Sequence, residues 1–494
     1  MSHQITVFDR SRPPRSAIVT SGALIVLLVL FIALDNQDPR PPIWVALIII
    51  CLSALRMILR PMRDHGHYLK IAHLRGIEDQ GQSAISEDSK RFALARFLYY
   101  LGMLTVTQTV LRKGGFAVSD WIFLASVVAT VVEGRRERQV PGAASRALSV
   151  GVVLLLAGGI LSSANARDPV SSYLQVLKYF YVVCIWLWLG SLTLRNVAQV
   201  RTALCCWIIS AAISGLAGIA EVVFPFGAAA RALAGGGRAI GLTEHANELG
   251  MVEAMALLPA LVMLGDSRGF LKKLVWAALG LFIVGGLILS VSVSALTGLL
   301  VASTLWMIGL SRPTTIKKRY LVTMLVLVIT STGFAIRFQS VHRLPNIYER
   351  LESLRQRSGG GYTVGTRLRT YRAAWERIGN DPFVGVGLDE KSARAADNWE
   401  VHNMLLLQWY EGGILSFLGI TIIVYAVWSL TWMSLVRSDN YVAFRISLAL
   451  YLSFIAFFIY AMTTPESRHR DAWLFAALPV AMEAVRRRLT PECA

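Results

Sequence analysis

Apolar runs of about 20 residues recur along the whole chain, and no other feature restricts the possible folds as strongly. A helix of about 20 residues crosses the hydrocarbon core of a bilayer, which is about 30 Å thick. Only 16% of the residues are charged, whereas soluble proteins carry about 25%. Inside lipid the backbone must satisfy its own hydrogen bonds, so each run is expected to be helical. The sequence therefore predicts an all-α, polytopic transmembrane helical bundle.

We expect about fourteen spans, each matching one apolar run. No small-residue cleavage site follows the first run, so we interpret it as a span and not as a cleaved signal peptide. The predicted spans are residues 17–34, 42–59, 93–111, 119–134, 148–164, 174–194, 204–225, 246–264, 274–292, 296–310, 320–336, 411–433, 446–464 and 472–485.

The distribution of positive charge predicts the orientation of these spans. If the N-terminus lies inside, most Lys and Arg residues of the short loops face the cytoplasm, as the positive-inside rule expects. An even number of spans then places both termini in the cytoplasm. The net charge of +18 is also compatible with nucleic-acid binding. Positive inner loops explain it better in a chain this apolar, so we expect no nucleic-acid partner.

Cysteine and histidine spacing favours neither a disulfide framework nor a metal site. Most of the five cysteines fall inside apolar runs, without the pattern of a disulfide framework. His65, His67 and His73 lie on an inner loop and do not have the spacing of a closed metal site. We therefore expect no metal and no cofactor.

One outer loop, residues 337–402, is too long to be a simple connection. It contains a helix-like stretch from Thr366 to Ile378. The turn signal Asn380-Asp381-Pro382 and the tight sequence Gly385-Val386-Gly387 follow this stretch. The sequence thus predicts one large, partly folded segment on the outer side.

Two outer segments combine arginine with histidine. The first, residues 237–250, holds Arg238, and the second, residues 365–413, holds Arg367 and His402. A planar guanidinium donates two parallel hydrogen bonds to phosphate oxygens, so arginines on opposite loops suit a diphosphate. A histidine beside them suits proton transfer from an attacking hydroxyl, because its pKa lies near neutrality.

The second segment follows a familiar order of motifs: Arg367-Leu368-Arg369-Thr370-Tyr371, then Asp381-Pro382 and Gly385-Val386-Gly387, then His402-Asn403 with Glu411-Gly412-Gly413. This combination resembles the O-antigen ligase and O-antigen polymerase superfamily. The first segment is similar to the other outer-loop motif of that superfamily, an arginine and a glycine followed by an asparagine and Leu-Gly. The chain departs from the pattern in Ser292-Val293-Ser294-Ala295, which lacks an arginine. It also has Tyr371 where tryptophan is common and His245 where proline is frequent, so the glycan is not specified.

The resemblance implies a multi-pass glycosyltransferase of the bacterial inner membrane with its active site facing the periplasm. It covers residues 93–485, so residues 1–92 are expected to be a two-span extension with a cytoplasmic linker and residues 486–494 a cytoplasmic tail. Members take a glycan from an undecaprenyl-diphosphate carrier and pass it to an acceptor glycan or glycolipid. Further polysaccharide assembly proteins are expected partners. By this resemblance, Arg238 and Arg367 map to the diphosphate-binding residues, and His402 maps to the catalytic base of a metal-independent, inverting displacement.

Four neighbours of these residues are further candidates for substrate binding: His245, Asn247, Glu248 and Asn403. Each also has an ordinary structural interpretation. A histidine or asparagine can cap a helix, a carboxylate can be buried and hydrogen-bonded, and an arginine at a span end can extend its charge to the interface.

Three functions compatible with this pattern remain open. A polymerase would add the glycan to another lipid-linked repeat unit, building O-antigen, capsule or exopolysaccharide. An O-antigen ligase would transfer it to lipid A core. We favour the polymerase, because nothing in the sequence identifies a lipid A acceptor site. The third function is a transporter of lipid-linked glycans, which usually shows internal repeats with broken helices; we find no such repeat in the sequence.

Overall fold

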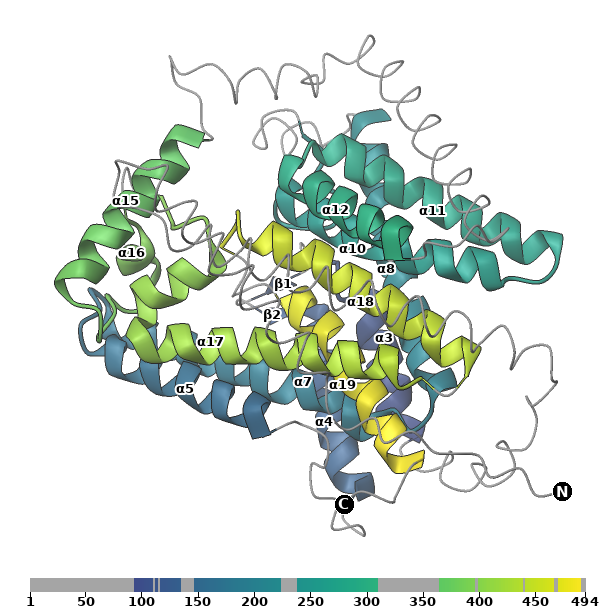
Figure 1. Cartoon of the computed structure of the whole chain (residues 1–494), viewed down its shortest axis with the longest axis horizontal. Helices are drawn as coiled ribbons and strands as arrows, with labels where there is room; N and C mark the ends of the chain where they lie inside the picture. The colour runs from purple at the N-terminus through teal and green to yellow at the C-terminus, as the bar shows by residue number, and fades with distance from the viewer. Residues whose placement is uncertain are drawn as a thin grey trace, which may run out of the picture.

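The computed structural model describes residues 93–109, 112–113, 116–134, 146–223, 238–309, 364–395, 399–438, 440–465 and 470–489. Apart from one antiparallel pair, β1 (Arg112–Lys113) and β2 (Phe116–Ala117), and one isolated bridge, the regular structure of these residues is helical. The predicted all-α class is confirmed (Figure 1). The predicted spans 17–34, 42–59 and 320–336, the linker 60–92 and the loop up to residue 363 lie outside the described residues.

The helices keep the labels of Figure 1, where the chain can be followed by colour from purple to yellow. In chain order they are α3 (Ala93–Thr105), α4 (Val118–Gly134), α5 (Arg146–Ser163), α6 (Pro169–Tyr179), the π-helix η2 (Phe180–Ile185), α7 (Trp186–Thr193), α8 (Val197–Val223), α10 (Ala246–Asp266), α11 (Phe270–Ser290), α12 (Val293–Gly309), α15 (Val364–Asn380), α16 (Glu390–Ala393), α17 (Met404–Val436), α18 (Tyr441–Ala461) and α19 (Arg470–Leu489).

Seven helices of the described part are long and apolar enough to cross a membrane. They are α5, the continuous run from α6 to α7, α8, α10, α11, α17 and α18. The shorter helix α12 is also apolar. Each predicted span inside the described ranges overlaps a helix, although α3 ends at Thr105, six residues before the end of the predicted span 93–111. Helix α15 matches the stretch predicted from Thr366 to Ile378. The chain is therefore a multi-pass membrane protein.

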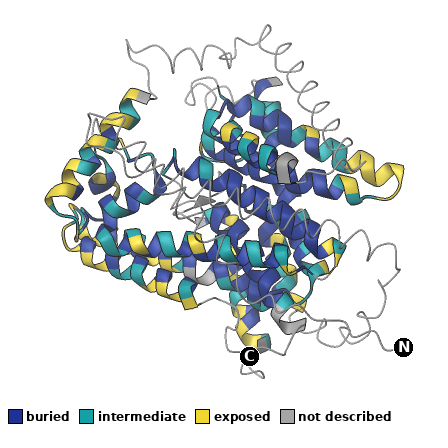
Figure 2. Cartoon of the chain, viewed as in Figure 1, coloured by how far each residue is buried: buried dark blue, intermediate teal, exposed yellow. Residues whose placement is uncertain are grey.

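The core lies around α10 and α18, which are dark blue along most of their length in Figure 2. Helix α10 packs against α8, α11 and α18, and α18 also packs against α12 and α17. Large apolar side chains on α3, α4 and α5 are instead exposed, among them Phe97, Trp121 and Val153. Such a surface is the one that a bilayer covers.

Helices α5 and α17 run side by side and carry the outer segments at one end (Figure 1). Small residues allow the close approach: a Cβ on Gly158 would lie 2.5 Å from the Ser416 backbone nitrogen. The Ser416 hydroxyl donates a hydrogen bond to the Leu155 carbonyl at 3.0 Å. Close backbone contact through glycine and serine is a common way to pack helices in membranes.

Helix α17 is broken at Gly413, whose φ of 71° and ψ of −170° are not helical. The predicted span 411–433 begins at this break. The turn after α15 fills the break, because Val386 N–H donates to the Tyr410 carbonyl and Gly387 N–H donates to the Glu411 carbonyl, both at 3.0 Å. The motifs Gly385-Val386-Gly387 and Glu411-Gly412-Gly413 thus form one structural unit.

Candidate active site

The candidate residues lie where several helices begin or end on the same side of the bundle. The Asn403 side chain at the start of α17 donates a hydrogen bond to the carbonyl of Met462, which ends α18, at 3.1 Å. Arg238 reaches both Asn247 at the start of α10 and Ser290 at the end of α11. Helices α15 and α16 lie at this end too, at the left of Figure 1. The segments singled out in the sequence therefore lie toward the same end of the helices.

His402 is held by hydrogen bonds that define the state of its ring. Its Nδ1 lies 2.8 Å from the Glu400 carbonyl. A carbonyl only accepts hydrogen bonds, so Nδ1 carries the proton and Nε2 of the neutral ring holds the lone pair. The Tyr371 hydroxyl donates to the His402 carbonyl at 2.5 Å and ties the residue to α15. The ring is therefore oriented as a proton acceptor at Nε2.

Arg367 lies close enough to His402 to influence its ionisation. Burial lowers the pKa of His402, and the Arg367 charge lowers it further. The hydrogen bond from the ring to the Glu400 carbonyl and the Glu400 charge act in the opposite direction. His402 is therefore neutral at neutral pH, as a general base must be. We call His402, Arg367, Tyr371 and Glu400 the His402 group.

Tyr371 occupies the position where the family pattern often has tryptophan. Burial raises the pKa of Tyr371 to about 12, although the nearby Arg367 charge opposes this shift. Its hydroxyl therefore keeps its proton at physiological pH and stays a hydrogen-bond donor to His402. The Tyr371 hydroxyl donates a hydrogen bond to the His402 carbonyl, and a tryptophan at this position would have no hydroxyl to make it.

Asn403 caps helix α17 and is only 3% exposed. Its side-chain oxygen accepts a hydrogen bond from Leu406 N–H at 2.9 Å. Since its side-chain nitrogen contacts Met462, both ends of the amide have structural partners. These contacts favour a role in positioning His402 over direct substrate contact.

Arg238 forms a second group with Asn247 and Ser290, which we call the Arg238 group. The Arg238 Nε donates to the Ser290 carbonyl at 2.7 Å, and its Nη2 donates to the Asn247 side-chain oxygen at 2.5 Å. The guanidinium is half-buried. An arginine fixed in this way is already oriented for an anion, so little conformational freedom is lost on binding.

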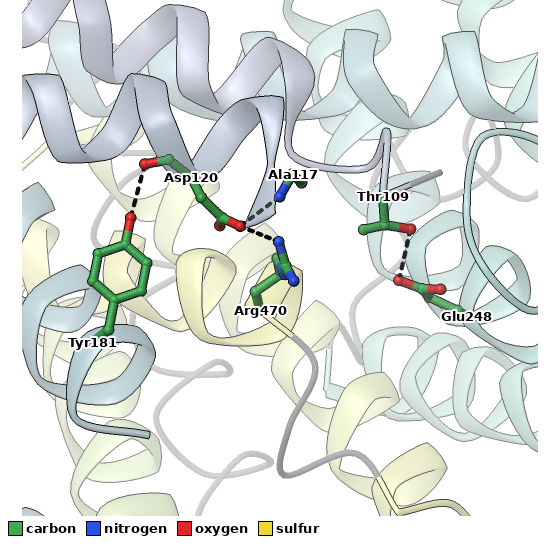
Figure 3. A network of polar contacts seen from close by, with 6 residues as sticks. All are labelled: Thr109, Ala117, Asp120, Tyr181, Glu248 and Arg470. Carbon is green, nitrogen blue, oxygen red and sulfur yellow. Dashed lines mark hydrogen bonds and ion pairs between the residues drawn. The ribbon is translucent and has the colours of Figure 1, made fainter. Parts of the chain in front are cut away.

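Glu248 and His245 differ in their surroundings although both belong to the start of α10. Glu248 is 3% exposed and accepts hydrogen bonds from the Thr109 hydroxyl at 3.3 Å and from Glu244 N–H at 2.9 Å. It joins the segment after α3 to α10 (Figure 3). His245 is exposed, and its side chain does not cap the helix. Both carboxylate oxygens of Glu248 therefore accept hydrogen bonds from the protein, whereas His245 is exposed at the surface.

A buried ion pair near Glu248 was not predicted from the sequence. Asp120 at the start of α4 pairs with Arg470 at the start of α19, and it also accepts a hydrogen bond from Ala117 N–H at 2.7 Å. The Tyr181 hydroxyl donates to the Asp120 carbonyl at 2.8 Å (Figure 3). The available signal was an acidic and a basic residue, each at the outer end of a predicted span.

Among the described residues, no group of three or more His, Cys, Asp and Glu side chains is arranged to hold a metal ion. The candidate residues supply two arginines, an imidazole and their hydrogen-bond partners. This set can bind a diphosphate and accept a proton.

Comparison with known proteins adds one match. Residues 277–421 match a family model described as O-antigen ligase. The matched region includes Arg367, His402 and Asn403 and extends from α11 into α17. A search of curated proteins finds no match. The family match supports a membrane glycosyltransferase of the O-antigen ligase or polymerase type, and it confirms the predicted resemblance of this chain to that superfamily.

Proposed function

We propose that the protein transfers a glycan from an undecaprenyl-diphosphate carrier to an acceptor glycan, as a polysaccharide polymerase of the O-antigen, capsule or exopolysaccharide type. The observation that carries this proposal is the hydrogen bond from His402 Nδ1 to the Glu400 carbonyl. It leaves Nε2 as the proton acceptor, next to the positive charge of Arg367.

The reaction is an inverting displacement that needs no metal. The acceptor hydroxyl attacks the anomeric carbon of the donor sugar from the face opposite the carrier. The new bond forms between the acceptor oxygen and this carbon, while the bond from the carbon to the diphosphate oxygen breaks. The hydroxyl proton passes to His402 Nε2, and the diphosphate leaves with the bonding electrons.

Arg238 and Arg367 stabilise the leaving diphosphate, whose negative charge grows in the transition state. Asn247 holds the Arg238 guanidinium in position, and Asn403 holds the backbone that follows His402. Glu248 contributes to substrate binding from the start of α10, where the Thr109 hydroxyl holds its carboxylate. His245 is exposed beside this group and contacts the substrate at its edge.

The proposed topology has about fourteen spans with both termini in the cytoplasm. Residues 93–485 form the catalytic core in the bacterial inner membrane, with the candidate site on the periplasmic side. Residues 1–92 add two spans and a cytoplasmic linker, and residues 486–494 form a cytoplasmic tail. Other polysaccharide assembly proteins deliver the donor to this side.

Transfer by the purified full-length protein in nanodiscs tests the proposal. The donor is the lipid-diphosphate-linked repeat unit of the producing strain, given alone or together with lipid A core. Elongated lipid-linked glycan from the donor alone is the expected product. Product that requires lipid A core would identify a ligase instead.

His402→Ala is the matched variant for this experiment. Loss of a general base lowers the rate by roughly 10²–10⁴-fold. Full activity in this variant, or no transfer by the wild-type protein under either condition, would overturn the catalytic proposal. The same nanodiscs would then be assayed for movement of the donor across the bilayer, the activity of a transporter.

A further inference from the structure

Trp399 lies beside His402 and is partly exposed, unlike the tryptophans of the core. The centroids of the two rings are 6.4 Å apart, and the ring planes are inclined by 53°. The side chain of Trp399 is 41% exposed, whereas Trp186 and Trp207 in the core are fully buried. Tryptophan has a large apolar surface, so an exposed indole beside a functional residue points to a ligand that covers it.

Backbone contacts of the described residues connect Trp399 to Ala395 and Glu400 to His402. Ala395 N–H donates a hydrogen bond to the Trp399 carbonyl at 2.9 Å. The next pair of residues, Arg394 and Glu400, forms an antiparallel bridge. The carbonyl of Glu400 in turn binds the His402 ring. Trp399 therefore presents its indole at a set position next to the proposed base, so binding a ligand there orders little of the protein.

The charge of the surroundings helps to identify this ligand. Glu400 and Arg394 flank Trp399, and both are half-buried. Arg394 also pairs with Glu390 at 2.5 Å. An apolar ring face bordered by hydrogen-bonding side chains matches a pyranose, which has C–H groups on its faces and hydroxyls around its edge. A lipid tail would gain nothing from these polar neighbours.

We infer that Trp399 is the stacking platform for the terminal sugar ring of the acceptor glycan. This inference rests on the proposed function, because it uses His402 as the base. A general base must lie about 2.6–3.2 Å from the hydroxyl that it deprotonates. The sugar ring next to His402 is therefore the acceptor ring, while the donor is held through its diphosphate by Arg238 and Arg367.

Acceptor kinetics test the platform. The acceptor is the repeat-unit oligosaccharide, freed of lipid and diphosphate by mild acid, and the lipid-linked donor is kept at one saturating concentration. Trp399→Ala should raise the half-saturating acceptor concentration about tenfold, with a smaller change in maximal rate. Trp399→Phe should stay near wild type, since it keeps a ring. Trp121→Ala removes the exposed indole of α4 and should change neither value.

Trp399→Leu provides the same contrast if the alanine variant does not fold, because leucine keeps an apolar side chain without a ring. An unchanged acceptor requirement in both variants, with active wild-type protein, would overturn the platform and leave the proposed function intact. If the variants raised the half-saturating concentration of the donor and not that of the acceptor, the assignment of Trp399 to the acceptor would be overturned.

A binding measurement separates the two proposals. Saturation-transfer NMR of the free oligosaccharide, without donor, should show transfer to the C–H protons of its terminal ring. This transfer should disappear in Trp399→Leu and persist in Trp399→Phe. Wild-type protein that gives this pattern but no glycosyl transfer would overturn the proposed function and support the platform. Equal signals in all variants would overturn the platform itself.

Discussion

The Arg238 group and the His402 group are held in place by different parts of the chain. The Arg238 group is held through the guanidinium, which donates to the Asn247 side chain and to the Ser290 carbonyl. The His402 group is held through backbone carbonyls, because the imidazole binds the Glu400 carbonyl and the Tyr371 hydroxyl binds the His402 carbonyl. The break of α17 that follows this group is also held by the backbone, as in the bond from Gly387 N–H to the Glu411 carbonyl. The first group should therefore respond to changes of charge and hydrogen bonding, and the second to changes of backbone shape.

The largest effect is expected at Gly413, in the break of α17 that follows the His402 group. Its φ of 71° is unfavourable for other residues, and a Cβ would lie 2.2 Å from the Phe383 carbonyl oxygen. Gly413→Ala should therefore lower the free energy of unfolding by more than ~2 kcal/mol and abolish glycan transfer. Thermal unfolding in detergent and the yield of monodisperse protein measure this effect. Gly379→Ala is the control, because nothing lies within 4 Å of the added Cβ. If Gly413→Ala were as stable as the wild-type protein, the proposed dependence of this region on backbone shape would be wrong.

The ion pair of Asp120 and Arg470 lies outside both groups and tests how far burial strengthens a contact between charged side chains. Asp120→Asn removes the charge that faces the Arg470 guanidinium, in an ion pair whose aspartate side chain is only 4% exposed, and should cost about 3 kcal/mol of stability. Glu390→Gln removes an ion pair whose carboxylate is 70% exposed and should cost less than ~0.5 kcal/mol. Thermal unfolding midpoints of the two variants provide the comparison. Equal shifts would mean that burial of the pair does not determine its contribution.

Arg238 tests whether the first group acts on the diphosphate. Arg238→Ala should lower the transfer rate roughly 10²–10³-fold, because it removes a charged donor to the leaving group. Arg238→Lys should recover only part of this loss, since an ammonium lacks the planar fork. Asn247→Ala should have a smaller effect, because it only releases the guanidinium. The measurement is the transfer rate at saturating donor. A rate in Asn247→Ala as low as the rate in Arg238→Ala would contradict the assigned roles.

The smallest effect concerns the pH dependence of the second group. His402 acts as a base only while neutral, so activity falls as the pH drops through its pKa. The Arg367 charge lowers this pKa. Arg367→Gln should therefore move the acidic limb of the rate profile to higher pH, in addition to weakening diphosphate binding. Arg369→Gln, on the exposed side of the same helix, is the control. An acidic limb at the same pH in both variants would show that Arg367 does not act on His402.

The sequence predicted the helices well because an apolar run is a local signal. Helix α15 and the helices at the predicted spans follow from such runs or from local patterns. The pairing of Arg367 with His402 was expected from the resemblance. The contacts of Asp120 with Arg470 and of Thr109 with Glu248 were not, because they join distant parts of the chain. Periodicity contains no information about such pairs.

The break at Gly413 was only partly predictable. Glu411-Gly412-Gly413 was recognised as a motif, and the span was expected to begin at residue 411. The sequence did not reveal that the α17 helix extends before the span and is interrupted there. This conformation depends on the turn that packs against it through Val386 and Gly387. A tertiary contact thus decides a local backbone angle.

The same break determines how much of α17 the bilayer must accommodate. An uninterrupted α17 of 33 residues would be about 50 Å long, at about 1.5 Å per residue. That length exceeds the hydrocarbon thickness by about 20 Å. The part after Gly413 is about 35 Å long, which a modest tilt fits to the membrane. The break at Gly413 therefore separates a part of α17 whose length matches the bilayer from a first part, which follows His402 and packs against α15.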